Sequence, residues 1–167
     1  KKAGVRVFPE IEVPLVGSKK EVDIVKAVID ATAQSLFAET GESGEYTVGS
    51  MIELPRAAVL ANEIAESCEF FEFGTNDLTQ TTLGMSRDDT AKILDEYRAR
   101  GVYVADPFAS VDQLGVGILI KDAVQKAVSG TLKIDCEVSK VDDSVIRGWS
   151  IVTIVEKPVF SLVVSVA

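Results

Sequence analysis

The chain has 167 residues, of which 47% are hydrophobic and 26% are charged, as in ordinary globular domains. Its net charge of −9, without any basic block, argues against a nucleic-acid surface. The absence of histidine excludes zinc sites of the His type, Ser-His-Asp hydrolysis and a phosphohistidine on this polypeptide.

The first part of the chain alternates strand-like and helical patterns. Ile11–Val16 is a short apolar run that predicts a buried strand. Ser18–Glu21 has the pattern of a capping box, which predicts the start of a helix. Thr40–Gly44 is a predicted loop, and Tyr46–Glu53 is the next predicted strand. We interpret an apolar stripe at helical spacing as the packing face of the helix: Val22, Val25, Ile29, Thr32 and Leu36.

The middle of the chain continues the alternation. Pro55 suits the first turn of a helix that we predict over Arg56–Ser67. Glu69–Phe73 is the third predicted strand, and either Asn76 or Asp77 is expected to cap the short helix after it.

Three further elements are predicted before the tail. Ser86–Asp89 predicts another helix start, and Gly101–Pro107 is a connection. Ser110–Gln113 resembles a second capping box, opening a helix that runs to about Ala127. Leu132–Val138 is a candidate fourth strand. Strands and helices that alternate over short connections predict an α/β fold with a parallel sheet.

The last part of the chain is rich in β-branched residues. Ile151–Val155 and Val159–Val164 are strand-like runs, separated by Glu156–Pro158. Because two charges and a proline interrupt this stretch, we favour a strand pair or a disordered tail over a membrane span. No secretory signal opens the chain, so we expect a cytoplasmic protein or one housed in an organelle.

Two acidic residues, Glu53 and Asp77, stand near the ends of successive predicted strands. In β/α architectures the carboxyl ends of the strands carry the site, and Mg²⁺ is commonly held there by one or two carboxylates. Gly74–Asn76 adds backbone that an anion can approach, close to a helix N-terminus. These residues predict a Mg²⁺ site; the alternatives are that Glu53 faces solvent and that Asp77 only caps a helix.

Four motifs follow one another along the chain: MIELPRAA, FFEFGTNDLTQ, GMSRDD and DPFASVDQLGVG. Together they resemble the C-terminal phosphoenolpyruvate/pyruvate-binding barrel of the pyruvate, phosphate dikinase family. The resemblance begins at PEIEVPLVGSKKE and runs to about Lys121, which is most of the chain. Phosphoenolpyruvate synthase and the sugar phosphotransferase enzyme I are relatives with a similar GTNDL element, but the SRDD and DPF segments favour the dikinase.

The resemblance implies a partial (β/α)8 TIM-type barrel with parallel strands, incomplete at both ends. A closed barrel of this type needs at least about 200 residues. We therefore expect a barrel segment over residues 1–131 and a divergent, β-rich tail over residues 132–167.

The resemblance also assigns site residues. Glu53 and Asp77 match the two Mg²⁺ ligands of the family, and Gly74, Thr75, Asn76 and Asp77 match its substrate-binding run for pyruvate or phosphoenolpyruvate. The family's proton-donating cysteine stands in a glycine-rich motif with a histidine. Cys136 lacks that motif, so we interpret it as a buried thiol and expect no catalytic residue in this chain.

The complete enzymes of the family convert ATP, pyruvate and phosphate into AMP, phosphoenolpyruvate and diphosphate. They use a phosphohistidine domain, an ATP-binding domain and two phosphate-binding arginines on earlier strands, and they dimerise through the barrel. Neither of the two domains nor the two arginines is recognisable in this sequence. The sequence therefore leaves two hypotheses: a dikinase (or synthase) fragment that carries part of the Mg²⁺–pyruvate site and is inactive alone, and a non-catalytic association module that forms a homodimer.

Overall fold

The computed structural model describes residues 7–130 and 161–165. It confirms the α/β class, because the described strands form one parallel sheet in the order β1-β2-β3-β4. The strands are β1 (Glu10–Val13), β2 (Thr47–Met51), β3 (Phe70–Gly74) and β4 (Ser161–Ser165). The three strands predicted before residue 80 are thus confirmed; β1 and β2 are shorter than predicted, and β3 is shifted by one residue.

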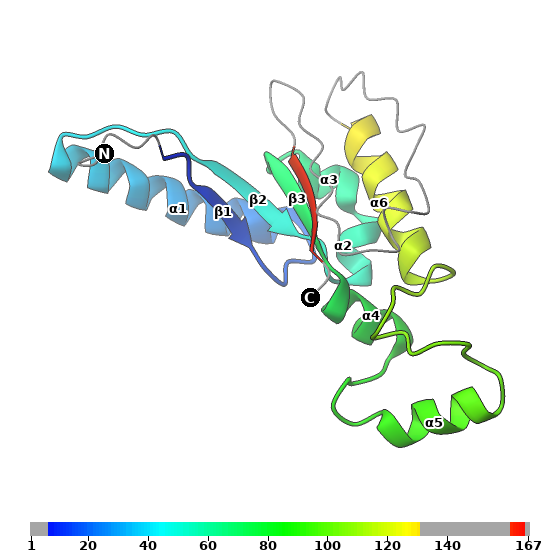
Figure 1. Cartoon of the computed structure of the whole chain (residues 1–167). Coiled ribbons are helices and arrows are strands. Elements are labelled where there is room, and N and C mark those ends of the chain that lie inside the picture. The colour runs from blue at the N-terminus through cyan, green and yellow to red at the C-terminus, as the bar shows by residue number, and fades with distance from the viewer. Residues whose placement is uncertain (1–6, 131–160, 166–167) are drawn as a thin grey trace.

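Helices connect the strands and cover one face of the sheet. They are α1 (Lys19–Thr40), α2 (Pro55–Val59), α3 (Ala61–Ala65), α4 (Thr75–Leu83), α5 (Ala91–Ala99) and α6 (Val116–Gly130). Figure 1 shows α1 beside β1 and β2. Behind the other end of the sheet lie α2, α3 and α6, whereas α5 stands apart from the sheet. Every helix in the described part of the chain is too short or too polar to cross a membrane.

The hydrophobic core lies between the sheet and these helices. Side chains alternate between the two faces of a strand, so Val48 and Ile52 point the same way, as do Phe71 and Phe73. These four are 1% exposed or less, and each is worth about 1.5–3 kcal/mol as buried apolar surface. The other face of the sheet therefore carries the residues in between, which include several acids.

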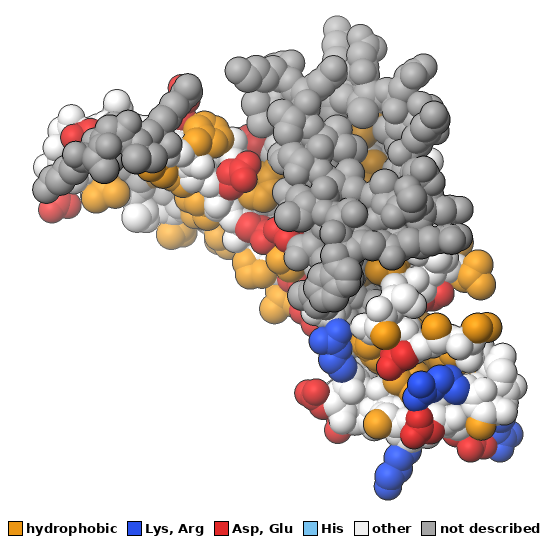
Figure 2. Space-filling view, in the orientation of Figure 1, with side chains coloured by type: hydrophobic (Ala, Val, Ile, Leu, Met, Phe, Trp, Pro, Cys, Tyr) orange, Lys and Arg blue, Asp and Glu red, His pale blue; other side chains and the backbone are white. Residues whose placement is uncertain are grey.

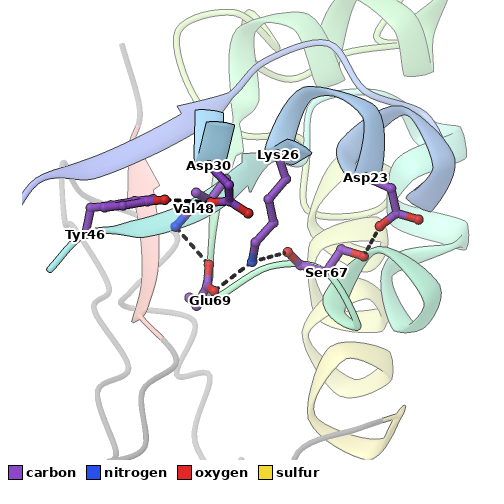
Figure 3. A network of polar contacts seen from close by, with 7 residues as sticks. All are labelled: Asp23, Lys26, Asp30, Tyr46, Val48, Ser67 and Glu69. Carbon is purple, nitrogen blue, oxygen red and sulfur yellow. Dashed lines mark hydrogen bonds and ion pairs between the residues drawn. The ribbon is translucent and has the colours of Figure 1, made fainter. Parts of the chain in front are cut away.

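A polar network fastens α1 to the amino ends of the strands (Figure 3). The Lys26 ammonium donates to the Ser67 carbonyl at 3.0 Å and to Glu69 Oε1 at 2.7 Å. The Tyr46 hydroxyl donates to Asp30 Oδ1 at 2.7 Å. These contacts lie just before β2 and β3 begin, which leaves the carboxyl ends of the strands for the candidate site.

The predicted packing face of α1 is only partly correct. Val22 is fully buried and Ile29 packs against the core, whereas Val25 is 37% and Leu36 54% exposed. A helix of 22 residues is about 33 Å long, but a strand of four or five residues spans only about 13–17 Å. The helix therefore extends past the described strands, and its second half lies beyond them (Figure 1).

Two predicted helix starts are wrong by several residues. Ser86–Asp89 forms a turn, in which the Thr90 hydroxyl donates to the Ser86 carbonyl at 2.8 Å, and α5 begins only at Ala91. At the second capping box, Asp112 Oδ1 accepts from the Leu114 N–H at 3.1 Å, and α6 begins after this local turn. In both places a short polar side chain stabilises a turn instead of a helix end.

The helix predicted over Arg56–Ser67 is divided into two. Leu60 has φ −102° and ψ 21°, outside the helical range, and it separates α2 from α3. The predicted strands at Leu132–Val138 and Ile151–Val155, together with Cys136, lie outside the described residues. The run predicted over Val159–Val164 overlaps β4.

Candidate metal and substrate site

Glu53 lies two residues beyond the end of β2 and is only 4% exposed. Its Oε1 accepts the Leu15 N–H at 2.7 Å. Leu15 follows β1 and has φ 55°, a left-handed conformation that a leucine rarely adopts. The alternative of a solvent-facing Glu53 is therefore wrong: a strained neighbouring loop turns its amide toward this buried carboxylate.

Asp77 lies against Glu53 at the beginning of α4. The helix starts at Thr75 with Gly74 as its N-cap and without a side-chain capping bond, so the prediction that Asn76 or Asp77 caps it is wrong. Burial raises the pKa of Glu53; the Leu15 N–H opposes this, and the charge of Asp77 and its hydrogen bond raise that pKa further. A buried carboxyl group whose pKa is raised by a neighbouring acid is a suitable partner for a cation.

Gly74 makes room for this pair. A Cβ atom at Gly74 would lie 2.6 Å from Glu53 Oε2 and 2.8 Å from Met51 Sδ, closer than real Cβ atoms come. Any other residue here would push the Glu53 side chain away. The close approach explains why a glycine stands at this strand end.

Asn76 forms a hydrogen bond with Arg87, a residue to which the sequence assigned no role. Arg87 Nη2 donates to Asn76 Oδ1 at 2.6 Å, and the guanidinium lies 5.8 Å from the centre of the Phe108 ring. A small pocket beside this contact is lined by Thr75, Asn76, Thr79 and the segment 107–111. Arg87 belongs to the quoted SRDD motif, yet spacing alone could not predict that its loop folds back toward α4.

A second acidic pair, Glu12 and Glu72, was also missed. Both are on the face of the sheet opposite the helices, and Glu12 Oε1 is buried without a donor among the described residues. The pKa of Glu12 is raised to about 7, chiefly by burial. The charge of Glu72, a hydrogen bond with Glu72 and the charge of Glu53 raise it further. Single acids inside the apolar runs IEV and FFEF were the available signal.

The donor set at Glu53 and Asp77 fits Mg²⁺. In the described residues, no three His, Cys, Asp or Glu side chains are grouped to hold an ion by themselves. Mg²⁺ commonly uses one or two carboxylates, several waters and oxygens of the substrate. The buried Glu53 and the half-buried Asp77 meet that need. Cys68 has no part here, because burial raises the pKa of its thiol to about 12.

Comparison with known proteins shows the family of the chain. Residues 1–139 match the family described as PEP-utilising enzyme, PEP-binding domain. The chain belongs to this family. It is 55% identical over 126 residues to the chloroplastic pyruvate, phosphate dikinase of Mesembryanthemum crystallinum, 53% over 123 residues to the dikinase of Clostridium symbiosum and 50% over 122 residues to that of Giardia intestinalis.

These alignments cover 73–75% of the chain but only 13–14% of each relative. The predicted resemblance is thus confirmed, and the chain spans about one seventh of the length of the curated relatives it matches. The match to the PEP-binding domain ends at residue 139, within the predicted tail. The boundary at residue 131 stays a prediction.

Proposed function

We propose that this chain provides the Mg²⁺-binding part of a phosphoenolpyruvate/pyruvate site of the pyruvate, phosphate dikinase type. The observation that carries the proposal is Glu53: an acid only 4% exposed, facing Asp77 at the carboxyl ends of neighbouring parallel strands. Placing the half-buried Asp77 beside the buried Glu53 is unfavourable unless a proton or a cation accompanies them. A divalent cation is the partner that the family relationship favours.

Glu53 and Asp77 would hold the ion, which would offset the negative charge on the carboxylate and enolate oxygens of a three-carbon substrate. The chain's own residues prepare that site. The Leu15 N–H holds one oxygen of Glu53, and Gly74 leaves room for the other. The first turn of α4 begins at Thr75, and the positive end of the helix dipole favours an anion there.

The proposal includes the fold that the resemblance implies, a partial (β/α)8 barrel incomplete at both ends. In the complete enzyme the chemistry would also need a phosphohistidine domain and an ATP-binding domain, and this chain contains no histidine. We expect the chain alone to bind pyruvate or an analogue and to turn over nothing.

A second candidate is the association module, which is supported by apolar side chains on the surface of α1. Ile24 is 56%, Val28 63% and Leu36 54% exposed, and Figure 2 shows hydrophobic side chains along the arm that contains this helix. Surfaces of this kind often mark contacts with other chains. The two candidates differ in whether the chain binds a ligand.

Calorimetric titration of oxalate, a pyruvate-enolate analogue, into the chain with Mg²⁺ tests the proposal. We expect saturable binding to the unsubstituted chain. Glu53→Gln and Asp77→Asn should each weaken it by at least about tenfold, or 1.4 kcal/mol, because each removes one charged ligand of the ion.

Glu63→Gln on α3 and Asp122→Asn on α6 are matched controls, because both side chains are exposed and lie outside the site. They should bind oxalate as the unsubstituted chain does. Saturable binding that survives both site substitutions would contradict the proposed ligands. No binding by the unsubstituted chain would instead favour the association module.

A further inference from the structure

Gln80 lies one helical turn after Asp77 on α4, and both the nitrogen and the oxygen of its side-chain amide form hydrogen bonds. Its Nε2 donates to Asp77 Oδ1 at 3.1 Å, and its Oε1 accepts the Arg87 N–H at 2.9 Å. A carboxylate can only accept and a backbone N–H can only donate, so the two partners together allow a single orientation of the amide.

The same segment returns to the site by a second route. Gly84, with φ 63°, ends α4 and turns the chain back, and the Arg87 side chain then donates to Asn76 Oδ1 at 2.6 Å. The contacts form a closed circuit through Asp77, Gln80, Arg87 and Asn76. Two residues of the candidate site are thereby held to one loop, and Gln80 is the side chain that joins Asp77 to it.

We propose that Gln80 is a positioning residue of the candidate Mg²⁺ site, which fixes the Asp77 carboxylate and couples it to the loop that carries Arg87. The proposal rests on the proposed function, because it assigns Gln80 a role toward the ion that Asp77 would bind. The hydrogen bond to Oδ1 restricts rotation of the carboxylate. The other oxygen, Oδ2, is then presented in one orientation.

Partners of this kind matter for affinity although they do not touch the ion. Their removal typically costs about 10–100-fold in metal affinity, because the free ligand side chain must be ordered again on binding. Gln80→Met keeps the length of the side chain and its helix propensity but removes both hydrogen bonds. Gln34→Met, at an exposed position on α1, is the matched control.

The first measurement is the titration of oxalate in saturating Mg²⁺ with the full chain. We expect Gln80→Met to weaken binding about tenfold and Gln34→Met to leave it unchanged. The second is amide hydrogen exchange at Arg87 without ligand, where Gln80→Met should speed exchange because the acceptor of that N–H is lost. This readout does not depend on any ligand.

Gln80→Glu separates positioning from simple structural support. Its carboxylate still accepts the Arg87 N–H but cannot donate to Asp77. Arg87 should stay protected while oxalate binding weakens at least as much as in Gln80→Met. Undiminished binding in Gln80→Met, or a loss of binding fully matched by a lower thermal midpoint in both variants, would overturn the inference. A chain that binds no oxalate before substitution would overturn the proposed function and this inference with it.

Discussion

At the scale of single residues, the candidate site depends on the absence of one side chain. Gly74 lies where Glu53 and Met51 already occupy the space that a Cβ would take. The strand end and the carboxylate are therefore packed against one another. A small substitution at Gly74 should therefore disturb the position of the Glu53 carboxylate more than it disturbs the fold.

Gly74→Ala should displace the Glu53 carboxylate, since its Cβ would meet Oε2 at 2.6 Å. We expect destabilisation of about 1–3 kcal/mol from overpacking and loss of Mg²⁺-dependent oxalate binding. Chemical denaturation and calorimetry measure the two effects. Gly44→Ala is the control, because its Cβ would make only ordinary contact with the Phe37 ring, at 3.6 Å. Normal binding by Gly74→Ala would show that the glycine serves no purpose at the site.

Glu12 should make stability depend on pH. Its pKa is raised from 4.5 to about 7, so the folded chain holds a proton that the unfolded chain releases. The stabilisation is complete below pH 4.5 and is lost as the pH rises through about 7. Because the group is partly solvated, we expect Glu12→Gln to recover only about 1 kcal/mol at alkaline pH.

Urea denaturation between about pH 5 and about pH 8 measures this effect. The free energy of unfolding should depend less steeply on pH in Glu12→Gln than in the unsubstituted chain. Glu10→Gln, an exposed position on the same strand, is the control. A profile for Glu12→Gln as steep as that of the unsubstituted chain would refute the raised pKa of Glu12.

The sequence was sufficient to select Glu53 and Asp77, because acids at successive strand ends follow from the alternation of strands and helices. It could not show that the two side chains lie against one another. It also could not reveal Arg87, Gln80 or the pair formed by Glu12 with its neighbour. Their positions depend on how a loop returns and on which strands lie side by side.

At the scale of elements, Lys26 and Glu69 connect α1 to the start of β3. Lys26 also donates to the Ser67 carbonyl, while Glu69 Oε2 accepts the Val48 N–H at 2.8 Å. One ion pair thus reaches the first helix and two strands. An ordinary surface ion pair joins only two side chains, whereas this one connects three elements of the fold.

Lys26→Met should lower the free energy of unfolding by about 1 kcal/mol, because the half-buried Glu69 and the Ser67 carbonyl both lose a charged donor. Lys19→Met is a matched control: Lys19 pairs with Asp23 at 3.0 Å on the same helix in an i, i+4 arrangement, worth only about 0.3–0.5 kcal/mol. Equal effects of the two substitutions in urea denaturation would contradict a linking role for Lys26.

Element types were predicted better than element ends. Pro55 correctly marked the first turn of a helix, and the strand before Glu53 ended close to the predicted place. The errors at Ser86–Asp89 and Ser110–Gln113 have a common cause. Capping residues and turn residues are chemically the same, so a local pattern cannot tell whether the next turn continues.

At the scale of the whole molecule, the described residues leave large apolar side chains on the surface. Val104 and Leu114 are fully or largely exposed, as are Ile24 and Val28 on α1. We expect the purified chain to self-associate at micromolar concentration, because such side chains are favoured against other apolar surfaces. Light scattering coupled to size exclusion measures the mass. A monomer with a sharp, reversible unfolding transition would contradict the expectation.

Magnesium-dependent oxalate binding tests the central claim most directly. The chain is titrated with oxalate in Mg²⁺ and again after chelation of the metal. We expect saturable one-site binding with Mg²⁺, at least about tenfold weaker after chelation and in Asp77→Asn. Binding that is indifferent to both chelation and substitution, or no binding at all, would contradict a Mg²⁺–pyruvate site at Glu53 and Asp77.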